Sequence, residues 1–210
     1  LGEVLRNHPN ILIASDDMYE HIALTDVPFV NILNTCPDLY PRTMVLNGVS
    51  KAYAMTGWRI GYAAGSEVII TAMENVQSQS TSNPTSISQV AAETALNGDQ
   101  NCLAPMIAAF RERHAFVVNG LNKIEGVKCV MAGGAFYAFP DMRAVIAKLH
   151  QRGTISAATD IALSEYLLAG AGVAVVPGSA FGSEGYIRLS FATSMDNLTK
   201  ALERLTKALG

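Results

Sequence analysis

The stretch NGVSKAYAMTGWRIGY, residues 47–62, places two cations between two short apolar runs. Lys51 lies in a turn of small residues, and Arg59 follows eight positions later at the head of the second run. Short apolar runs, here residues 43–46 and 60–63, are typical of strands buried on both faces of a sheet. The stretch therefore predicts two strands joined by a loop that carries both cations.

Beyond this stretch, strand-like and helix-like segments alternate along the first half of the chain. Residues 11–14 form another apolar run, and helical patterns begin at Ser66 and at Pro84. Short strands that alternate with amphipathic helices predict an α/β fold with a mainly parallel sheet.

From about residue 100 the pattern changes to that of a small α+β layer. A long helix is expected from Pro105 to Gly126, and further helices around residues 160–168 and from Asp196. Strand-like segments lie between these helices, at residues 127–131, 135–139, 173–176 and 186–191. We therefore predict two domains, residues 1–100 and residues 101–210, of which the second begins with a long interdomain helix.

Composition and charge narrow the class of protein. Half of the 210 residues are hydrophobic and 16% are charged, which favours a globular protein with a sizeable core. The net charge of −3 is spread along the chain, so nucleic acid is not an expected partner. No apolar stretch approaches the roughly 20 residues of a membrane span. The three cysteines are unclustered, which predicts neither a disulfide framework nor a metal site and fits a reducing cytoplasm.

Acidic, phenolic and basic residues follow the predicted strands. Asp16, Asp17 and Tyr19 come directly after the first apolar run, and Lys51 comes after the second. Ligands of open α/β sheets bind outside the carboxyl ends of the strands. Arg188 stands on the polar face of an otherwise apolar β segment. Taken singly, each has an ordinary structural explanation, but together they suit a phosphorylated aromatic aldehyde and an amino acid.

Pyridoxal phosphate calls for these residue types. A carboxylate, here Asp16, keeps a neighbouring pyridine nitrogen protonated because an opposite charge favours the charged form. A phenol such as Tyr19 can hydrogen-bond the ring oxygen, and a lysine amine such as Lys51 can form a Schiff base. The guanidinium fork of Arg59 suits a phosphate group. One cation of the opening stretch would thus be the covalent link and the other the phosphate clamp.

Three segments carry a family resemblance. They are Asp16–Tyr19, Ser50–Lys51 with Gly57–Tyr62, and Tyr186–Ala192. They resemble the signatures of class I/II pyridoxal-phosphate-dependent aminotransferases, the aspartate aminotransferase superfamily of fold type I. The resemblance covers essentially the whole chain but only the second half of a typical family member. It implies that residues 1–100 are the C-terminal part of the large cofactor-binding domain and residues 101–210 the small domain.

The resemblance also implies roles for individual residues. Lys51 would carry the Schiff base and transfer the proton at the substrate's α-carbon, Asp16 would pair with the pyridine nitrogen, and Tyr19 would contact the ring oxygen. Arg59 would bind the phosphate, with Ser50 as a weaker candidate.

Substrates and assembly follow from the same resemblance. Arg188 would bind the α-carboxylate of an amino acid or a 2-oxo acid, and the active protein would be a homodimer. The animal-type aspartate enzymes carry an arginine at the position of Ser78, so the binding of a distal carboxylate is not explained at that place. An aspartate-like donor is favoured by subgroup similarity, and aromatic or alanine-type donors stay open.

Several family features precede the region that this chain resembles: the phosphate cup, the aromatic residue that stacks on the cofactor, and an Asn-Pro motif. We therefore expect a partial chain of a protein about twice as long, inactive by itself. Two alternatives remain. One is a pyridoxal-phosphate-dependent lyase of the same fold, which would release ammonia. The other is a non-catalytic aminotransferase-like sensor domain of a transcription regulator, which a preceding DNA-binding segment would reveal.

Overall fold

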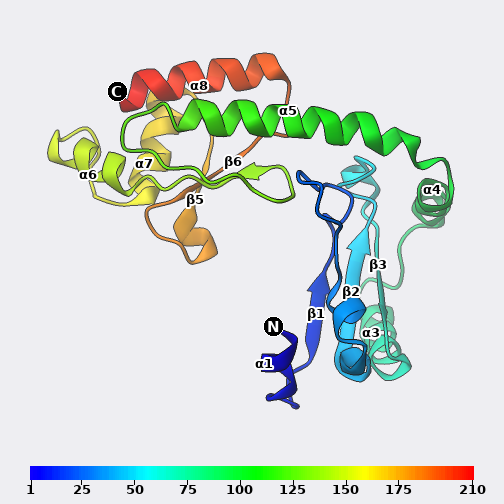
Figure 1. Cartoon of the computed structure of the whole chain (residues 1–210). Helices are drawn as coiled ribbons and strands as arrows, with labels where there is room; N and C mark the ends of the chain where they lie inside the picture. Colours follow the sequence, from blue (N-terminus) through cyan, green and yellow to red (C-terminus); the bar gives the residue numbers. More distant parts are fainter. The chain divides into compact units, whose positions relative to one another are not determined.

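The structure is a computed structural model that describes all 210 residues. It divides into two compact units, Leu1–Pro105 and Met106–Gly210, each of which is described by itself (Figure 1). The predicted domains, residues 1–100 and residues 101–210, stay a prediction, because a division into compact units does not show which family domain each unit corresponds to.

The first unit is built on a three-stranded sheet. Its strands are β1 (Ile13–Asp16), β2 (Thr43–Gly48) and β3 (Gly61–Gly65), in the order β1-β2-β3 (Figure 1). β1 and β2 are parallel, whereas β2 and β3 are antiparallel with Gly48 opposite Gly61. The end of β1, the end of β2 and the start of β3 therefore share one edge of the sheet. The apolar runs located these strands to within a few residues, but they did not reveal the direction of β3.

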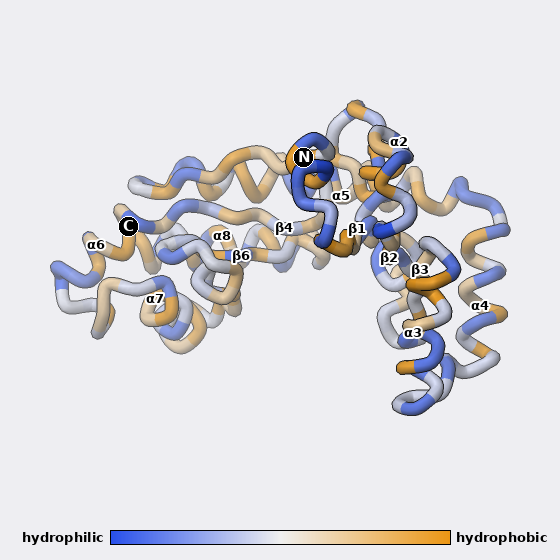
Figure 2. The backbone as a smooth tube through the Cα atoms, turned by 90° about the horizontal axis from the view of Figure 1, so that it is seen from below, coloured by the Kyte–Doolittle hydropathy of each residue, from blue (hydrophilic) through white to orange (hydrophobic).

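Two long helices follow this sheet, α3 (Glu67–Ser80) and α4 (Ser86–Asn97), close to where the sequence predicted them. Shorter helical segments complete the unit: α1 (Gly2–Arg6), α2 (Ile32–Thr35), η1 (Pro37–Arg42), η2 (Thr56–Trp58) and η3 (Gln100–Cys102). α3 buries no residue and α4 buries only Ser88 and Ala92, and Figure 2 shows hydrophobic positions among polar ones along α4. The core of this unit lies instead around its turns, at Ile22, Leu39, Val49 and Ala52.

The second unit combines helices with a small antiparallel sheet. Its helices are α5 (Leu103–Leu121), which begins at the unit boundary, α6 (Arg143–Gln151), α7 (Asp160–Tyr166), the π-helix η4 (Leu167–Ala171) and α8 (Met195–Leu209). The strands β4 (Tyr137–Ala138), β6 (Ile187–Ser190) and β5 (Val176–Pro177) pair in the order β4-β6-β5, and the turn η5 (Gly178–Phe181) follows β5. α5 and α8 lie side by side (Figure 1), so closely that a Cβ atom on Gly120 would lie 2.5 Å from Leu202 Cδ1.

Two expectations for the second unit need correction, and one helix was missed. The long helix ends at Leu121 rather than at Gly126, whose φ of +84° is not helical. The strand expected at residues 127–131 is reduced to one isolated bridge between Lys128 and Asp141, because no neighbouring strand continues the pairing. Helix α6 was not anticipated.

The core of the second unit is formed by side chains from α5, α7, β6 and α8. Members that are at most 1% exposed include Val117, Val118, Leu121, Leu163, Ile187, Phe191 and Leu205. All three cysteines of the chain are free. None of the helices combines the length and the apolar character needed to cross a membrane.

His114 is a polar member of this core, 2% exposed. Its Nε2 accepts a hydrogen bond from the Ala132 amide at 3.0 Å, and its ring lies 5.4 Å from the ring of Phe191. Burial lowers the pKa of His114 below its ordinary value of 6.5, because the charged imidazolium would lose hydration. The neutral ring is also the form that can accept the Ala132 hydrogen bond.

This burial predicts a pH dependence of stability. The unfolded chain binds a proton at His114 at a higher pH than the folded chain, so the free energy of unfolding should fall as pH drops below about 6.5. Urea unfolding at pH 7.5 and pH 5.5 would measure this, and His114→Gln should lessen the difference between the two pH values. His150→Gln, at an exposed position, is the control. An equal pH dependence in wild type and His114→Gln would contradict the assignment.

Candidate active site

One edge of the first unit's sheet carries four of the residues singled out in the sequence. Asp16 ends β1, Tyr19 lies in the turn after it, and Lys51 lies in the turn after β2. Arg59 stands just before β3. Because β3 is antiparallel to β2, β3 begins beside the end of β2. Asp16 and Arg59, which are 43 positions apart in the sequence, thus lie at the same end of the sheet.

Lys51 and Tyr19 approach each other at this edge. Lys51 Nζ lies 5.9 Å from the centroid of the Tyr19 ring. Both side chains are partly exposed, so an amine and a phenol from two different turns face the same space. Ser50, directly before Lys51, is also partly exposed. The Lys51 amine and the Tyr19 ring therefore lie near each other, in the turns that follow two neighbouring strands.

The adjacent carboxylates Asp16 and Asp17 have opposite environments. Asp16 is exposed, and its Oδ1 accepts a hydrogen bond from the Met18 amide at 3.2 Å. Asp17 is only 7% exposed; it accepts hydrogen bonds from Ser15 Oγ, at 2.8 Å, and from Asn31 Nδ2. Asp17 therefore holds the turn together, whereas Asp16 is available to a ligand.

A buried amide joins the two turns, and sequence reasoning missed it. Asn47 Nδ2 donates to Glu20 Oε1 at 2.8 Å, while Asn47 Oδ1 accepts the Gly48 amide at 2.7 Å. A Cβ atom on Gly48 would lie 3.1 Å from Met18 Cε and 3.2 Å from Gly61 Cα, so a glycine suits this close approach. The signal was available, since Asn47 and Gly48 open the stretch that carries Lys51.

Arg59 is held in an uncommon backbone conformation. Its φ of 52° is in the left-handed region, as is the φ of 54° at Ala54 in the same loop. Such non-glycine residues cost on the order of 1 kcal/mol or more each and are maintained by their surroundings. Here Arg59 Nη1 donates to the Thr56 carbonyl, and Ser88 Oγ of α4 donates to the Trp58 carbonyl, both at 2.8 Å. The loop is thus tied to itself and to α4, and it presents an exposed guanidinium.

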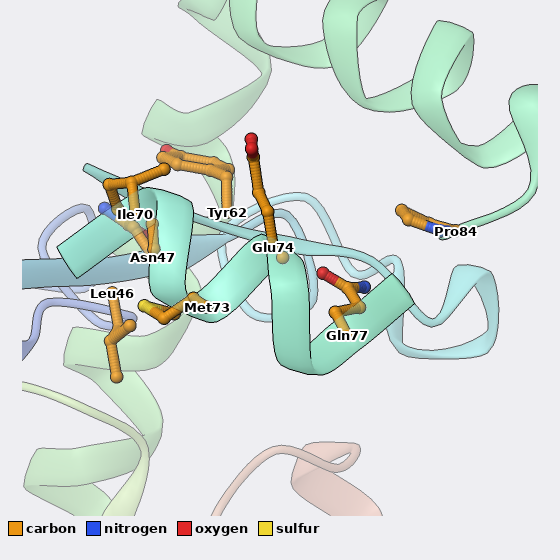
Figure 3. Close-up of a pocket in the computed structure, with 10 residues that line it drawn as sticks. Leu46, Asn47, Tyr62, Ile70, Met73, Glu74, Gln77 and Pro84 are labelled. Atoms are coloured by element: carbon orange, nitrogen blue, oxygen red, sulfur yellow. The ribbon is translucent and has the colours of Figure 1, made fainter. Parts of the chain in front are cut away.

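Two of the hollows beside this loop and strand are lined by Arg59 or by the end of β2. Arg59 lines one of about 530 Å³, together with the Asn83–Thr85 segment and Ser88. The other, of about 440 Å³, is lined by the end of β2, the start of β3 and α3, from which Ile70, Met73, Glu74 and Gln77 contribute side chains (Figure 3). Asp16, Tyr19 and Lys51 line neither hollow. Of these two hollows, only the one at Arg59 is lined by a predicted site residue. An anion bound in it could therefore contact the Arg59 guanidinium.

Arg188 belongs to the second unit, on β6. As predicted, Ile187 and Leu189 are buried on one face of the strand, whereas Arg188 and Ser190 are on the more exposed face. The guanidinium carbon of Arg188 lies 4.5 Å from the centroid of the Tyr137 ring and 4.2 Å from that of Phe181. No ion pair of Arg188 is present within the chain, so its hydrogen-bonding fork is free for a ligand.

Comparison with known proteins now places the chain. The family described as aminotransferase class I and II matches residues 1–205. The chain belongs to this family. It is 65% identical over 209 residues to the aspartate/prephenate aminotransferase of Nitrosomonas europaea, covering 100% of this chain and 53% of that protein. It is 50% identical to an aspartate aminotransferase of Rhizobium meliloti, covering 99% of this chain and 50% of that protein.

Solved structures of family members agree with the fold. The aspartate aminotransferase of Rhizobium meliloti superimposes with a TM-score of 0.90 at 48% identity, covering 99% of this chain and 52% of that one. An aromatic aminotransferase of Pyrococcus horikoshii gives 0.88 at 34% identity, covering 99% and 53%. The predicted α/β fold and family are therefore confirmed. The chain spans about half the length of the relatives it matches, and which half this is stays a prediction from the motifs.

The tie between Ser88 and the Arg59 loop can be tested with the chain's single tryptophan, Trp58. Ser88→Ala removes the hydroxyl that donates to the Trp58 carbonyl, so the loop should become more mobile. The expected result is a lower fluorescence anisotropy of Trp58. Ser86→Ala, at an exposed position of the same helix, should leave the signal unchanged. Equal signals from Ser88→Ala and wild type would show that the loop holds without this bond.

Proposed function

We propose that this protein is a pyridoxal-phosphate-dependent aminotransferase that moves an amino group from an L-amino acid to a 2-oxo acid. The observation that carries the proposal is the approach of Lys51 Nζ to within 5.9 Å of the Tyr19 ring centroid, at the edge that also presents Asp16 and Arg59. Membership of the aminotransferase family supports the reaction class.

The residues present fit pyridoxal phosphate. An exposed carboxylate, a partly exposed amine and an exposed guanidinium stand along one sheet edge, at Asp16, Lys51 and Arg59. These groups complement a pyridinium nitrogen, an aldehyde and a phosphate in turn. When bound, the cofactor supplies an electron sink for the charge that develops at the substrate's α-carbon.

The chain's own groups would then divide the work. Asp16 would keep the proton on the ring nitrogen, Tyr19 would hydrogen-bond the ring oxygen, and Arg59 would bind the phosphate, with Ser50 as an additional donor. Lys51 Nζ would hold the cofactor covalently, and as a general base and acid it would accept the substrate's α-proton and return it. Arg188 binds the substrate's α-carboxylate through its planar fork.

Substrate choice, assembly and location belong to the same proposal. The name of the Nitrosomonas europaea relative favours aspartate as donor and prephenate as an acceptor. Aspartate is also the donor in the name of the Rhizobium meliloti relative. A homodimer and a cytoplasmic location complete the proposal. The lyase and sensor alternatives gain no support, because these relatives are named aminotransferases.

The covalent role of Lys51 gives a direct test. The intact protein with pyridoxal phosphate should show an imine absorption band, and borohydride reduction should fix the cofactor's mass on the peptide that contains Lys51. Lys51→Ala should lose both signals, and Lys123→Ala, a control in the second unit, should keep both. A reduced peptide that carries the label at another lysine would refute the assignment.

The contrast between Asp16 and Asp17 gives a second test. Asp16→Asn should lower kcat by about 10- to 1,000-fold, equivalent to the roughly 1–3 pKa units that an adjacent charge contributes to the ring nitrogen. Folding stability should change little, since Asp16 is exposed.

Asp17→Asn is the matched control for this test. It disturbs the buried hydrogen bonds from Ser15 and Asn31 and should cost about 1–3 kcal/mol of unfolding free energy, with a smaller effect on the kcat of the folded enzyme. Steady-state kinetics and urea unfolding of both variants are the measurements. The reverse ranking would exchange the two roles.

A further inference from the structure

The guanidinium of Arg188 lies close to two aromatic rings. Tyr137 comes from β4, whose residue 137 pairs with Ser190, and Phe181 comes from the turn η5. The ring centroids are 4.5 Å and 4.2 Å from the guanidinium carbon. Aromatic faces attract a guanidinium, and the hydrogen-bond donors of that group lie in its own plane. Two rings can therefore hold Arg188 while its donors stay available.

Tyr137 is placed by a strand, but Phe181 needs the turn η5 to hold it. Phe181 is 46% exposed, so burial alone does not fix its ring. The turn begins at Gly178, whose amide donates to the Tyr186 carbonyl at 2.8 Å. A Cβ atom on Gly178 would lie 2.3 Å from the Ser183 carbonyl oxygen, so the turn packs tightly against the chain that leads into β6.

A buried carboxylate anchors the same turn. Asp160, the first residue of α7, is 2% exposed, and its Oδ2 accepts the Ser179 amide at 2.6 Å. Burial acts to raise the pKa of Asp160, but hydrogen bonds from Ser179 and from the Gly185 amide outweigh it, and the pKa lies below its ordinary value. The carboxylate is thus charged at neutral pH, and its bond to Ser179 is charge-assisted.

We propose that Asp160 and Phe181 are positioning residues for Arg188. Asp160 fixes the turn η5, the turn holds the Phe181 ring over the guanidinium, and the Tyr137 ring adds a second aromatic contact. The long side chain of Arg188 is then already ordered before a carboxylate binds, so less conformational freedom is lost on binding. The inference rests on the proposed function in one respect, that the ligand is the substrate's α-carboxylate.

The test begins with Phe181→Leu in the intact enzyme. Both the amino acid and the 2-oxo acid carry the α-carboxylate, so the KM values for aspartate and for prephenate should rise by a similar factor of up to about tenfold, the cost of ordering one long side chain. The kcat should stay within about twofold, because the lost binding is common to ground and transition states. Phe181→Tyr, which keeps an aromatic ring at this position, should have KM values close to those of wild type.

Phe139→Leu is the matched control. The Phe139 ring meets Phe181 edge to face at 6.3 Å and stacks on Tyr186, but it does not lie over Arg188. The same substitution at this position should leave both KM values near wild type. Equal rises in Phe139→Leu and Phe181→Leu would overturn the proposal, since they would indicate a general loosening of the cluster.

A second readout does not depend on turnover. The Nε–H resonance of Arg188 in ¹⁵N-labelled protein, assigned by its loss in Arg188→Lys, reports how the guanidinium is held. Phe181→Leu and Asp160→Asn should both broaden or shift it, and Phe181→Tyr should not. An unchanged resonance in both of the first two variants overturns the proposal. A changed resonance in a protein without transaminase activity supports the positioning role and rejects the proposed function instead.

Discussion

The candidate site depends on the antiparallel return of β3 beside β2. Gly48 and Gly61 stand opposite each other, and a Cβ atom on Gly48 would come within 3.2 Å of Gly61 Cα. Because Gly48 and Gly61 are paired, the loop between the strands begins and ends at the same place. Lys51 lies in the first part of this loop and Arg59 lies near its end. Had β3 paired in parallel, Arg59 would stand at the opposite edge from Asp16 and Lys51.

Around this pairing, the buried polar side chains hold the turns and the loop in place, whereas the exposed ones face the solvent. Asp17, Asn47 and Ser88 are buried, and each makes a hydrogen bond that fixes a turn or the loop. Asp16 and Arg59 are exposed and keep their charge toward solvent. Buried polar groups need partners, because an unsatisfied one is costly. The same rule leaves the exposed groups available for a ligand.

In the second unit, Arg188 is held by contacts with aromatic rings rather than by hydrogen bonds within the chain. Arg188 is placed against two aromatic rings rather than against a carboxylate of the chain. An internal carboxylate would compete with an incoming one for the same donors, whereas aromatic faces leave these donors available. The buried carboxylate in this arrangement, Asp160, accepts a hydrogen bond from the backbone of the turn and makes none with the arginine itself.

By itself the sequence determined the elements that depend on local pattern and the family to which the chain belongs. The apolar runs located β1, β2 and β3, the periodic segments located α3, α4 and α8, and the lysine and arginine signatures identified the family. Helix α6 escaped notice although Val145, Ile146 and Leu149 form a buried face, because Met142 at its N-cap provides no capping side chain. The apolar run at residues 127–131 was read as a strand, since a pattern does not show whether a partner strand is present.

Only the tertiary structure decided how these pieces meet. It set the direction of β3, buried Asp17 but not its neighbour Asp16, and brought Phe181 and Tyr137 to Arg188 from separate elements. Two adjacent aspartates are alike in sequence and differ only in what surrounds them. Hydrogen bonds and ring contacts between residues distant in the chain are a property of packing, which local periodicity does not encode.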